Sequence, residues 1–358
     1  MMPPYSTLLF LCLVCILPFV HSKTTLPIIG RNSTGVVITS MALTDSRRHD
    51  PFAKDGRARS IVVSGFSPVS NCRHQHEIAY MPSTTAKFQD EKYSSYGLPN
   101  GTFQSLSLRT CVADSNSTKC PSRSPPLVIF SGALATSRMI YNSLLQSVAA
   151  AGYLVLSIDH PYDADIVEFP DGTSIVGVNI EDSEIEDALA VRVEDISFVY
   201  KQLANPSFRT KLFPMHRHAR SLQNTAIIGH SFGGAAAATA MQQIPFIRGG
   251  LNIDGTMFGS VLETGLKRPF MLIGHENKTQ ATDPSWKQIW PHLTGWKKEI
   301  EVKGAAHYSF SDLPLIAAET GLQDLLPPEV EQVLGSIEGR QMMNFTVTYI
   351  RNFLRTVL

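Results

Sequence analysis

The stretch TAIIGHSFGGAAAATAMQQ (residues 225–243) decides the fold. TAIIG (225–229) is an apolar run of strand length, and GGAAAATAMQQ (233–243) is a helix of small residues. The junction reads Gly-His-Ser-Phe-Gly, with Ser231 at its centre. A serine on a tight strand-to-helix turn presents its hydroxyl, and flanking glycines let neighbouring backbone approach closely. Ser231 is therefore the candidate nucleophile, and a glycine-rich turn with a helix-capping serine is the alternative.

Short apolar runs and helical patterns alternate on both sides of this stretch. The runs are LVIF (127–130), YLVLSID (153–159), GLNID (250–254) and RPFMLIG (268–274), and a further strand is expected near residues 298–303. Apolar residues at helical spacing predict helices over about 137–152, 184–204 and 341–354. Two β-prone segments, 36–43 and 59–66, add antiparallel strands at one edge, and a turn at 170–172 predicts a hairpin over 165–178 near the mouth of the site. The pattern predicts one α/β domain, a mostly parallel central sheet with helices on both faces.

The composition narrows the class of protein. The chain has 358 residues, of which 43% are hydrophobic, and its 31 Lys and Arg balance 31 Asp and Glu. This hydrophobic fraction excludes a disordered chain, and the zero net charge argues against coating nucleic acid by bulk electrostatics. No internal apolar run reaches the roughly 18–20 residues of a membrane-spanning helix.

The N-terminus predicts export. Thr7–Val20 is an apolar stretch typical of a signal-peptide core, and we expect cleavage after Ser22. The domains are then a signal peptide over 1–22 and a catalytic domain over 23–358. No positive residue precedes the apolar stretch, so an uncleaved anchor is the alternative. Five Asn-x-Ser/Thr sites indicate a secreted glycoprotein: Asn32, Asn100, Asn116, Asn277 and Asn344.

Three cysteines remain after cleavage, which allows one internal disulfide. Cys111 and Cys120 bracket a short polar loop and are the expected pair; Cys72 with Cys111 is the competing pair. No Cys-x-x-Cys spacing remains and the histidines are scattered, so no metal site and no cofactor are expected.

A serine nucleophile needs a histidine base that is oriented by a carboxylate. His307 follows the last predicted strand and is the expected base, whereas His275 and His292 are expected to make surface or structural contacts. Two carboxylates compete for the orienting role, because Asp254 and Glu276 each follow a strand downstream of the serine. Asp254 is favoured by the neighbouring glycine and by the glycosylation site beside Glu276. Asp159 precedes the serine and is expected to anchor a loop.

An oxyanion hole completes such a site. The N–H of Phe232, directly after the serine, is one expected donor. The other is expected from the loop SGALATSR (131–138), whose small residues fit around a reacting carbonyl.

Together, several segments resemble the platelet-activating-factor acetylhydrolases of the plasma and intracellular type II kind, most closely secreted fungal members. They lie in order between about residues 36 and 312: ALTDSRRHDPF (42–52), AYMPSTTAKFQ (79–89), IFSGALATSR (129–138), GHSFGG (229–234), NIDGTMF (252–258) and KGAAHYSFSD (303–312).

The resemblance implies an α/β-hydrolase fold and a calcium-independent serine esterase that removes short or oxidised acyl groups from the sn-2 position of phospholipids. It implies Ser231 as nucleophile, His307 as base and Asp254 as acid. It also implies the N–H of Leu134 as the second oxyanion donor. One departure is visible: the family usually has His-Gly where this chain has Gly132 and Ala133.

We therefore expect a secreted, cofactor-free serine esterase. Its substrate is a small-molecule or lipid ester, with transient contact with a lipid surface and no nucleic-acid partner. A general carboxylesterase, or a lactone or polyester hydrolase, is the alternative within enzymes. A binding protein on a former hydrolase scaffold is the alternative outside them.

Overall fold

The computed structural model describes residues 23–30, 34–70, 72–113, 124–216 and 223–358. The predicted signal peptide over 1–22 lies outside these residues. Among the described residues, no helix is long and apolar enough to cross a membrane.

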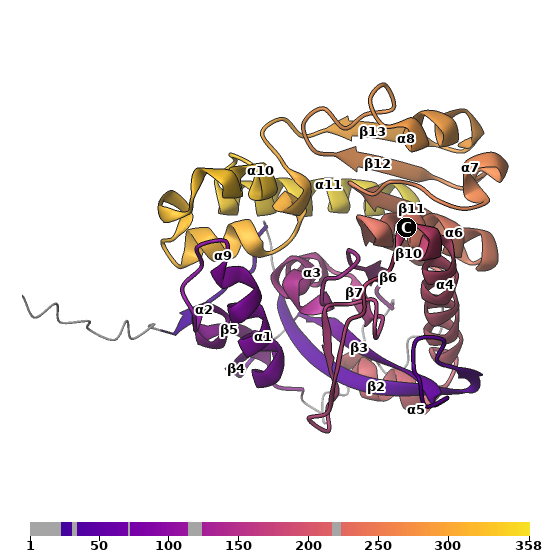
Figure 1. Ribbon diagram of the computed structural model, residues 1–358. Helices are drawn as coiled ribbons and strands as arrows, with labels where there is room; N and C mark the ends of the chain where they lie inside the picture. The colour runs from indigo at the N-terminus through magenta and orange to yellow at the C-terminus, as the bar shows by residue number, and fades with distance from the viewer. Residues whose placement is uncertain (1–22, 31–33, 71, 114–123, 217–222) are drawn as a thin grey trace, which may run out of the picture.

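One eight-stranded sheet forms the centre of the molecule (Figure 1), in the order β13-β12-β11-β10-β6-β7-β3-β2. The six strands from β13 to β7 are parallel, and β3 and β2 continue the sheet antiparallel at one edge, as the sequence predicted. The expected strand segments all form strands of this sheet: β2 (Gly35–His49), β3 (Ala58–Val69), β6 (Leu127–Ser131), β7 (Leu154–Asp159), β10 (Thr225–His230), β11 (Ile247–Ile253), β12 (Phe270–Gly274) and β13 (Lys297–Glu301).

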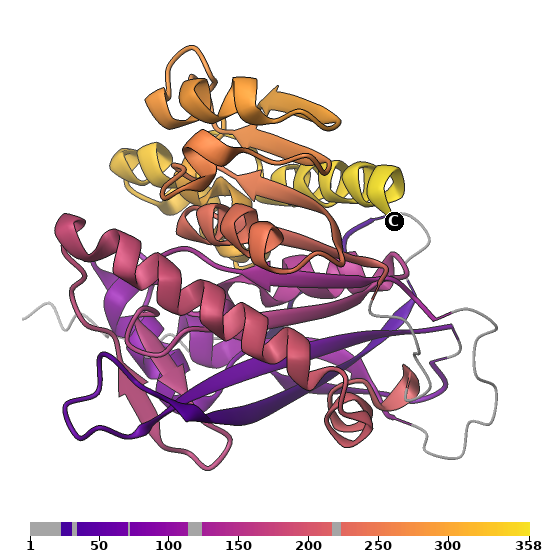
Figure 2. The same ribbon diagram turned by 90° about the vertical axis from the view of Figure 1, so that its right-hand side faces the viewer.

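Both faces of the sheet are buried, because side chains alternate along each strand. In β6, Val128 and Phe130 pack into one core and Leu127 and Ile129 into the other. The first core includes α3 (Asn142–Ala150) and α11 (Gly339–Val357); the second includes α4 (Ile185–Gln202) and α6 (Phe232–Gln243). In Figure 2, the long helix α4 crosses in front of the sheet.

Smaller elements surround this core. The predicted hairpin is β8 (Ile166–Glu168) paired with β9 (Ser174–Val176). A second sheet joins β1 (Thr24–Thr25), β5 (Leu106–Cys111) and β4 (Gln75–Ala79). The remaining helices are α1 (Ser83–Ser94), α2 (Thr102–Ser105), α5 (Pro206–Leu212), α7 (Val261–Thr264), α8 (Pro284–Ile289), α9 (Leu313–Glu319) and α10 (Glu331–Leu334).

The disulfide corrects the expected cysteine pairing. Cys111 is bonded to Cys72 and not to Cys120, with a Cα–Cα separation of 5.7 Å. Cys111 ends β5, and Cys72 lies just before the paired strand β4, so the sheet brings them together although they are 39 residues apart. Closeness along the chain was a poor guide, because strand pairing decides which side chains meet. Cys120 lies outside the described residues.

Three of the five predicted glycosylation sites can be placed. Asn100, Asn277 and Asn344 are exposed, whereas Asn32 and Asn116 lie outside the described residues. Asn344 lies on the outer face of α11, whose inner face buries residues such as Met343 and Val347. A glycan at Asn344 would therefore point away from the core.

Candidate active site

Ser231 lies on a sharp turn between β10 and α6, at the carboxyl edge of the sheet. Its backbone is left-handed, with φ 55° and ψ −126°, which a side chain rarely adopts without support. Two glycines make the turn possible: a Cβ on Gly229 would lie 1.8 Å from the carbonyl oxygen of Gly233, and one on Gly233 would lie 2.0 Å from that of Ser131. The Gly-x-Ser-x-Gly spacing is thus a steric requirement of this turn.

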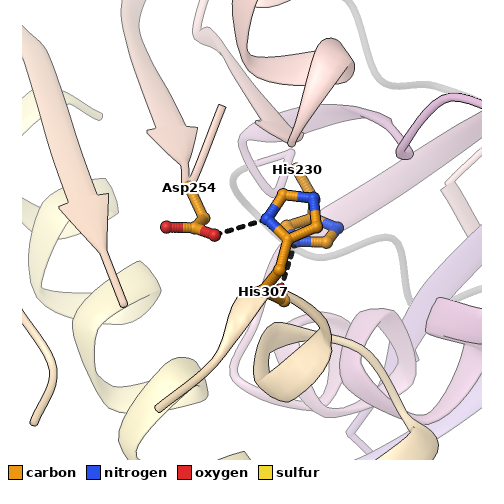
Figure 3. A group of neighbouring side chains, drawn as sticks. All are labelled: His230, Asp254 and His307. Atoms are coloured by element: carbon orange, nitrogen blue, oxygen red, sulfur yellow. Dashed lines mark hydrogen bonds and ion pairs between the residues drawn. The ribbon is translucent and has the colours of Figure 1, made fainter. Parts of the chain in front are cut away.

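The structure brings the three predicted side chains into one hydrogen-bonded chain. The His307 Nε2 lies 2.9 Å from the Ser231 Oγ, and the His307 Nδ1 lies 2.5 Å from the Asp254 Oδ2 (Figure 3 shows the latter pair). Asp254 follows β11 and His307 follows β13, so three strand ends supply the three groups. This arrangement can remove the hydroxyl proton of a serine and stabilise the histidinium that results.

The carboxylate of Asp254 is also bound by His275, which the sequence did not place in the site. His275 directly follows β12; its Nδ1 lies 2.6 Å from the Asp254 Oδ1, and its backbone N–H donates to the same oxygen at 2.9 Å. Burial by itself would raise the pKa of Asp254, but hydrogen bonds from His275 and His307 lower it to about 2. Asp254 is therefore ionised at neutral pH. The sequence signal that could have placed His275 in the site is its position directly after β12, the strand adjacent to β11.

The competing residues lie elsewhere. Glu276 is exposed and accepts a hydrogen bond from the N–H of Gly304 at 3.0 Å. His292 is exposed in the turn after α8. Asp159 ends β7 and forms a buried ion pair with Arg138, accepting its backbone N–H at 2.6 Å as well, so it anchors the segment after the 131–138 loop.

The N–H groups of the two expected oxyanion donors are not used within the described part of the protein. In the described part of the chain, neither Leu134 nor Phe232 has a hydrogen-bond partner for its N–H. The N–H groups that flank Leu134 are occupied: that of Ala133 donates to the Tyr141 hydroxyl at 3.2 Å, and that of Ala135 to the carbonyl of Asp163 at 2.9 Å. Within 133–135, Leu134 therefore has the one N–H available to a ligand.

His230 links His307 to the 131–138 loop through the hydroxyl of Tyr141, which also accepts the N–H of Ala133. Burial, together with the nearby His307 ring, lowers the pKa of His230 to about 3, so this side chain is neutral. The Tyr141 hydroxyl donates to its Nδ1 at 2.8 Å, and its Nε2 donates to the carbonyl of His307 at 2.9 Å (Figure 3). His230, Asp254 and His307 also offer ligand atoms within 4.8 Å of one another, as a metal site would. Their hydrogen bonds to protein groups favour a positioning chain instead.

Several known ester hydrolases are similar to this chain in sequence. A probable 1-alkyl-2-acetylglycerophosphocholine esterase of Arthroderma benhamiae is 28% identical over 338 residues, which cover 88% of this chain and 84% of that protein. Platelet-activating factor acetylhydrolases of Cavia porcellus and Gallus gallus are 28% and 22% identical over 52% and 59% of this chain; the matches cover 48% and 58% of their own lengths.

A solved structure and a family model extend the comparison. The ferulic acid esterase from Streptomyces cinnamoneus superimposes with a TM-score of 0.76 over 94% of both chains at 24% identity, a likeness that establishes the α/β-hydrolase fold alone. The family model described as platelet-activating factor acetylhydrolase, isoform II, matches residues 99–169 and 183–358, which is more than half of the chain. The chain therefore belongs to the platelet-activating factor acetylhydrolase isoform II family of ester hydrolases.

Proposed function

We propose that this protein is a serine esterase that hydrolyses short-chain acyl esters through an acyl-enzyme on Ser231. The observation that carries the proposal is the chain from the Ser231 Oγ through His307 to Asp254, at 2.9 and 2.5 Å. The Ser231 Oγ attacks the ester carbonyl carbon while the His307 Nε2 takes its proton. The tetrahedral intermediate then expels the alcohol, which receives that proton. A water molecule, deprotonated by His307, attacks the acyl-enzyme and releases the acid.

The negative charge of the tetrahedral intermediate needs donors that are already in place. The free N–H groups of Leu134 and Phe232 are the donors in this proposal. Asp254 fixes the ring of His307 through Nδ1, which leaves Nε2 directed at Ser231. Each group thus has one task, and no cofactor is needed.

The proposed substrate is the sn-2 acetyl or short acyl ester of a platelet-activating-factor-like phospholipid. The names of both relatives support an acetyl ester, and that of the Arthroderma benhamiae esterase gives an alkyl glycerophosphocholine as the alcohol that is released. The loop departs from the pattern that the resemblance implies at Gly132 and Ala133, so the alcohol that is released is the part of the proposal to test first. A general carboxylesterase is the other outcome of that test.

We further propose that residues 1–22 are removed on export and that 23–358 form the secreted catalytic domain. The internal disulfide between Cys72 and Cys111 supports this, because such bonds persist in oxidising compartments. N-terminal sequencing of protein collected from the medium should begin at Lys23, and deglycosylation should lower its mass. A chain retained with the membrane fraction and starting at Met1 would contradict this proposal.

The experiment compares the purified protein with Ser231→Ala on matched esters. We expect hydrolysis of p-nitrophenyl acetate and a higher kcat/KM for sn-2 acetyl than for sn-2 palmitoyl phosphatidylcholine. Ser231→Ala should abolish both activities, whereas Ser94→Ala, an exposed serine on α1, should retain them. Equal rates on simple aryl and phospholipid esters would favour the general carboxylesterase, and full activity in Ser231→Ala would contradict the proposal.

A further inference from the structure

Arg192 is a buried arginine in the middle of α4 that has no place in the chain from Ser231 to Asp254. It is 2% exposed, and its charge is paired with Asp163, which is also buried. The Arg192 Nε donates to the Asp163 Oδ2 at 2.5 Å, and its Nη2 donates to the other carboxylate oxygen. Because the pair is neutral overall, the remaining donors of the guanidinium are free to bind uncharged groups.

Those donors all reach the loop that follows β6. The Nη1 of Arg192 donates to the carbonyl of Gly132 at 2.6 Å and to the Ser131 Oγ at 3.1 Å. Its Nη2 donates to the carbonyl of Ala133 at 3.1 Å. The guanidinium carbon also lies 4.7 Å from the centre of the Phe232 ring, in a cation–π contact. One planar group thus contacts both segments that carry the free N–H groups.

The contact with Ala133 acts on Leu134 through the peptide bond. The carbonyl of Ala133 and the N–H of Leu134 belong to the same planar trans peptide unit and point in opposite directions. Fixing the carbonyl on Arg192 therefore fixes the direction of the N–H. A charged donor on the carbonyl also polarises the peptide and makes its N–H a stronger donor.

The backbone of Asp163 also holds the peptide that follows Leu134. The backbone carbonyl of Asp163 accepts the N–H of Ala135 at 2.9 Å, and the Lys92 Nζ donates to the carbonyl of Ala135 at 3.0 Å. Ala135 has a left-handed backbone with φ 52°, which needs such support. The peptides on both sides of Leu134 are therefore held from α4 and from the Asp163 turn.

We propose that Arg192, together with Asp163, is a positioning residue for the oxyanion hole: it orients the N–H of Leu134 through the Ala133 carbonyl and fixes Phe232 through its ring. This inference rests on the proposed function, since an oxyanion forms only if Ser231 attacks an ester. Arg192 touches no substrate, so its effect should fall on the charged intermediate and not on substrate binding.

The test is Arg192→Lys, which keeps the charge but loses the planar fork. Removal of one oxyanion donor costs about 100- to 1000-fold in kcat, so a misplaced donor should cost about 10- to 100-fold, with a smaller change in KM. The specific readout is the affinity for a trifluoromethyl ketone. The Ser231 Oγ adds to this ketone, the proton passes to His307, and the ketone oxygen becomes the oxyanion. Its inhibition constant should rise by the same factor as kcat/KM falls.

The matched control is Arg268→Lys, because Arg268 also donates to backbone carbonyls, including that of Ile244, but at the opposite end of α6. It should leave kcat and inhibitor affinity within twofold of the wild type. If Arg192→Lys fails to fold, the double variant Arg192→Met/Asp163→Asn, which leaves no unpaired buried charge, takes its place. A folded variant of either kind with wild-type kcat and inhibitor affinity overturns the inference.

Ser231→Ala is measured in the same series, so that the two proposals fail separately. Ser231→Ala inactive and Arg192→Lys fully active would contradict only the role of Arg192. Activity retained in Ser231→Ala would contradict the proposed function and, with it, this inference. A fall in kcat with unchanged ketone affinity would also overturn the inference, because a misplaced oxyanion donor must weaken both.

Discussion

Two hydrogen-bonded Ser-His-Asp chains begin at neighbouring strands of the sheet, because Ser231 directly follows β10 and Ser131 ends β6. In the first, Ser231, His307 and Asp254 are joined at 2.9 and 2.5 Å. In the second, the Ser131 Oγ lies 3.1 Å from the His160 Nε2, and the His160 Nδ1 lies 2.9 Å from the Asp195 Oδ2. The order of the side chains is the same, and the distances are similar.

Their surroundings differ. The His307 side chain is 38% exposed, whereas all three residues of the second chain are at most 3% exposed. Ser231 lies on a left-handed turn and is followed by Phe232, whereas Ser131 ends a regular strand and its oxygen accepts a hydrogen bond from Arg192.

The two carboxylates are also held differently. Histidines alone are the side-chain partners of Asp254 in the part of the chain that the structure describes, whereas Asp195 is bound by the guanidinium groups of Arg48 and Arg59. Burial by itself would raise the pKa of Asp195, but Arg59 and His160 keep it well below the usual range of a carboxyl group. The first chain is open to solvent at His307, whereas the second is buried and held by arginine side chains. Access and strain, more than the order of side chains, separate the candidate active site from a structural network.

The largest effect is expected at the acid of the exposed chain. Asp254→Asn should lower kcat about 1000- to 10,000-fold, because the amide cannot hold His307 in the required tautomer. Glu276→Gln is the matched control, since this carboxylate follows the next strand but lies outside the chain. Steady-state kinetics on p-nitrophenyl acetate measure both losses, and equal losses in the two variants would contradict the assignment of Asp254 as the carboxylate that orients His307.

The buried chain should respond in stability instead. Asp195→Asn removes one of the two buried carboxylates that pair with Arg59, the other being Asp50, which should lower the free energy of unfolding by about 1–3 kcal/mol. Urea unfolding measures this loss. The folded fraction should keep a kcat close to that of the wild type on the same ester. A stable variant that has lost its activity would mean that the second chain takes part in the chemistry.

The pH dependence of stability should separate the chains further. Burial chiefly lowers the pKa of His160 below its usual value, so the unfolded chain takes up a proton below about pH 6.5 while the folded chain does not. Stability from this group is therefore present above about pH 6.5 and is lost as the pH falls, by at most about 1.4 kcal/mol per pH unit. His160→Gln should flatten that part of the curve. An unchanged slope would show that His160 is not held neutral.

The smallest effect is expected at Ser131. Ser131→Ala removes one buried hydroxyl between Arg192 and His160, which should cost about 1 kcal/mol of stability. Thermal unfolding measures the cost, and Ser231 should still react with an active-site label. A loss of activity as large as that of Asp254→Asn would contradict the comparison.

The fold and the first chain were predictable because their signals are local. All the parallel strands but the edge strand β13 are short apolar runs. Ser231, Asp254 and His307 each follow a strand, so they meet at the carboxyl edge of the sheet. The tight turn at Ser231 could be inferred from the nearby glycines, Gly229 and Gly233, because a side chain at either position would clash with backbone. His275 could have been found by the same rule, because it also follows a strand directly.

The second chain and the role of Arg192 could not be predicted in this way. Ser131 and Arg192 are 61 residues apart, and Arg59 and Asp195 are 136 apart, with no motif to connect them. Helical spacing places Arg192 on the apolar face of α4, three residues after Leu189 and four before Ile196, but it names no partner for the buried charge. The expected cysteine pairing was wrong for the same reason, because a long-range contact, the pairing of β4 with β5, brings Cys72 to Cys111.

The most direct test of the central claim is the site of covalent labelling by a fluorophosphonate probe, found by mass spectrometry of digested protein. Ser231 and Ser131 each begin a Ser-His-Asp chain but differ in access to solvent, so the labelled serine shows which chain reacts. We predict stoichiometric loss of activity with the label on the peptide that contains Ser231, and no label in Ser231→Ala. A label on Ser131, or full inactivation with Ser231 unmodified, would contradict the account.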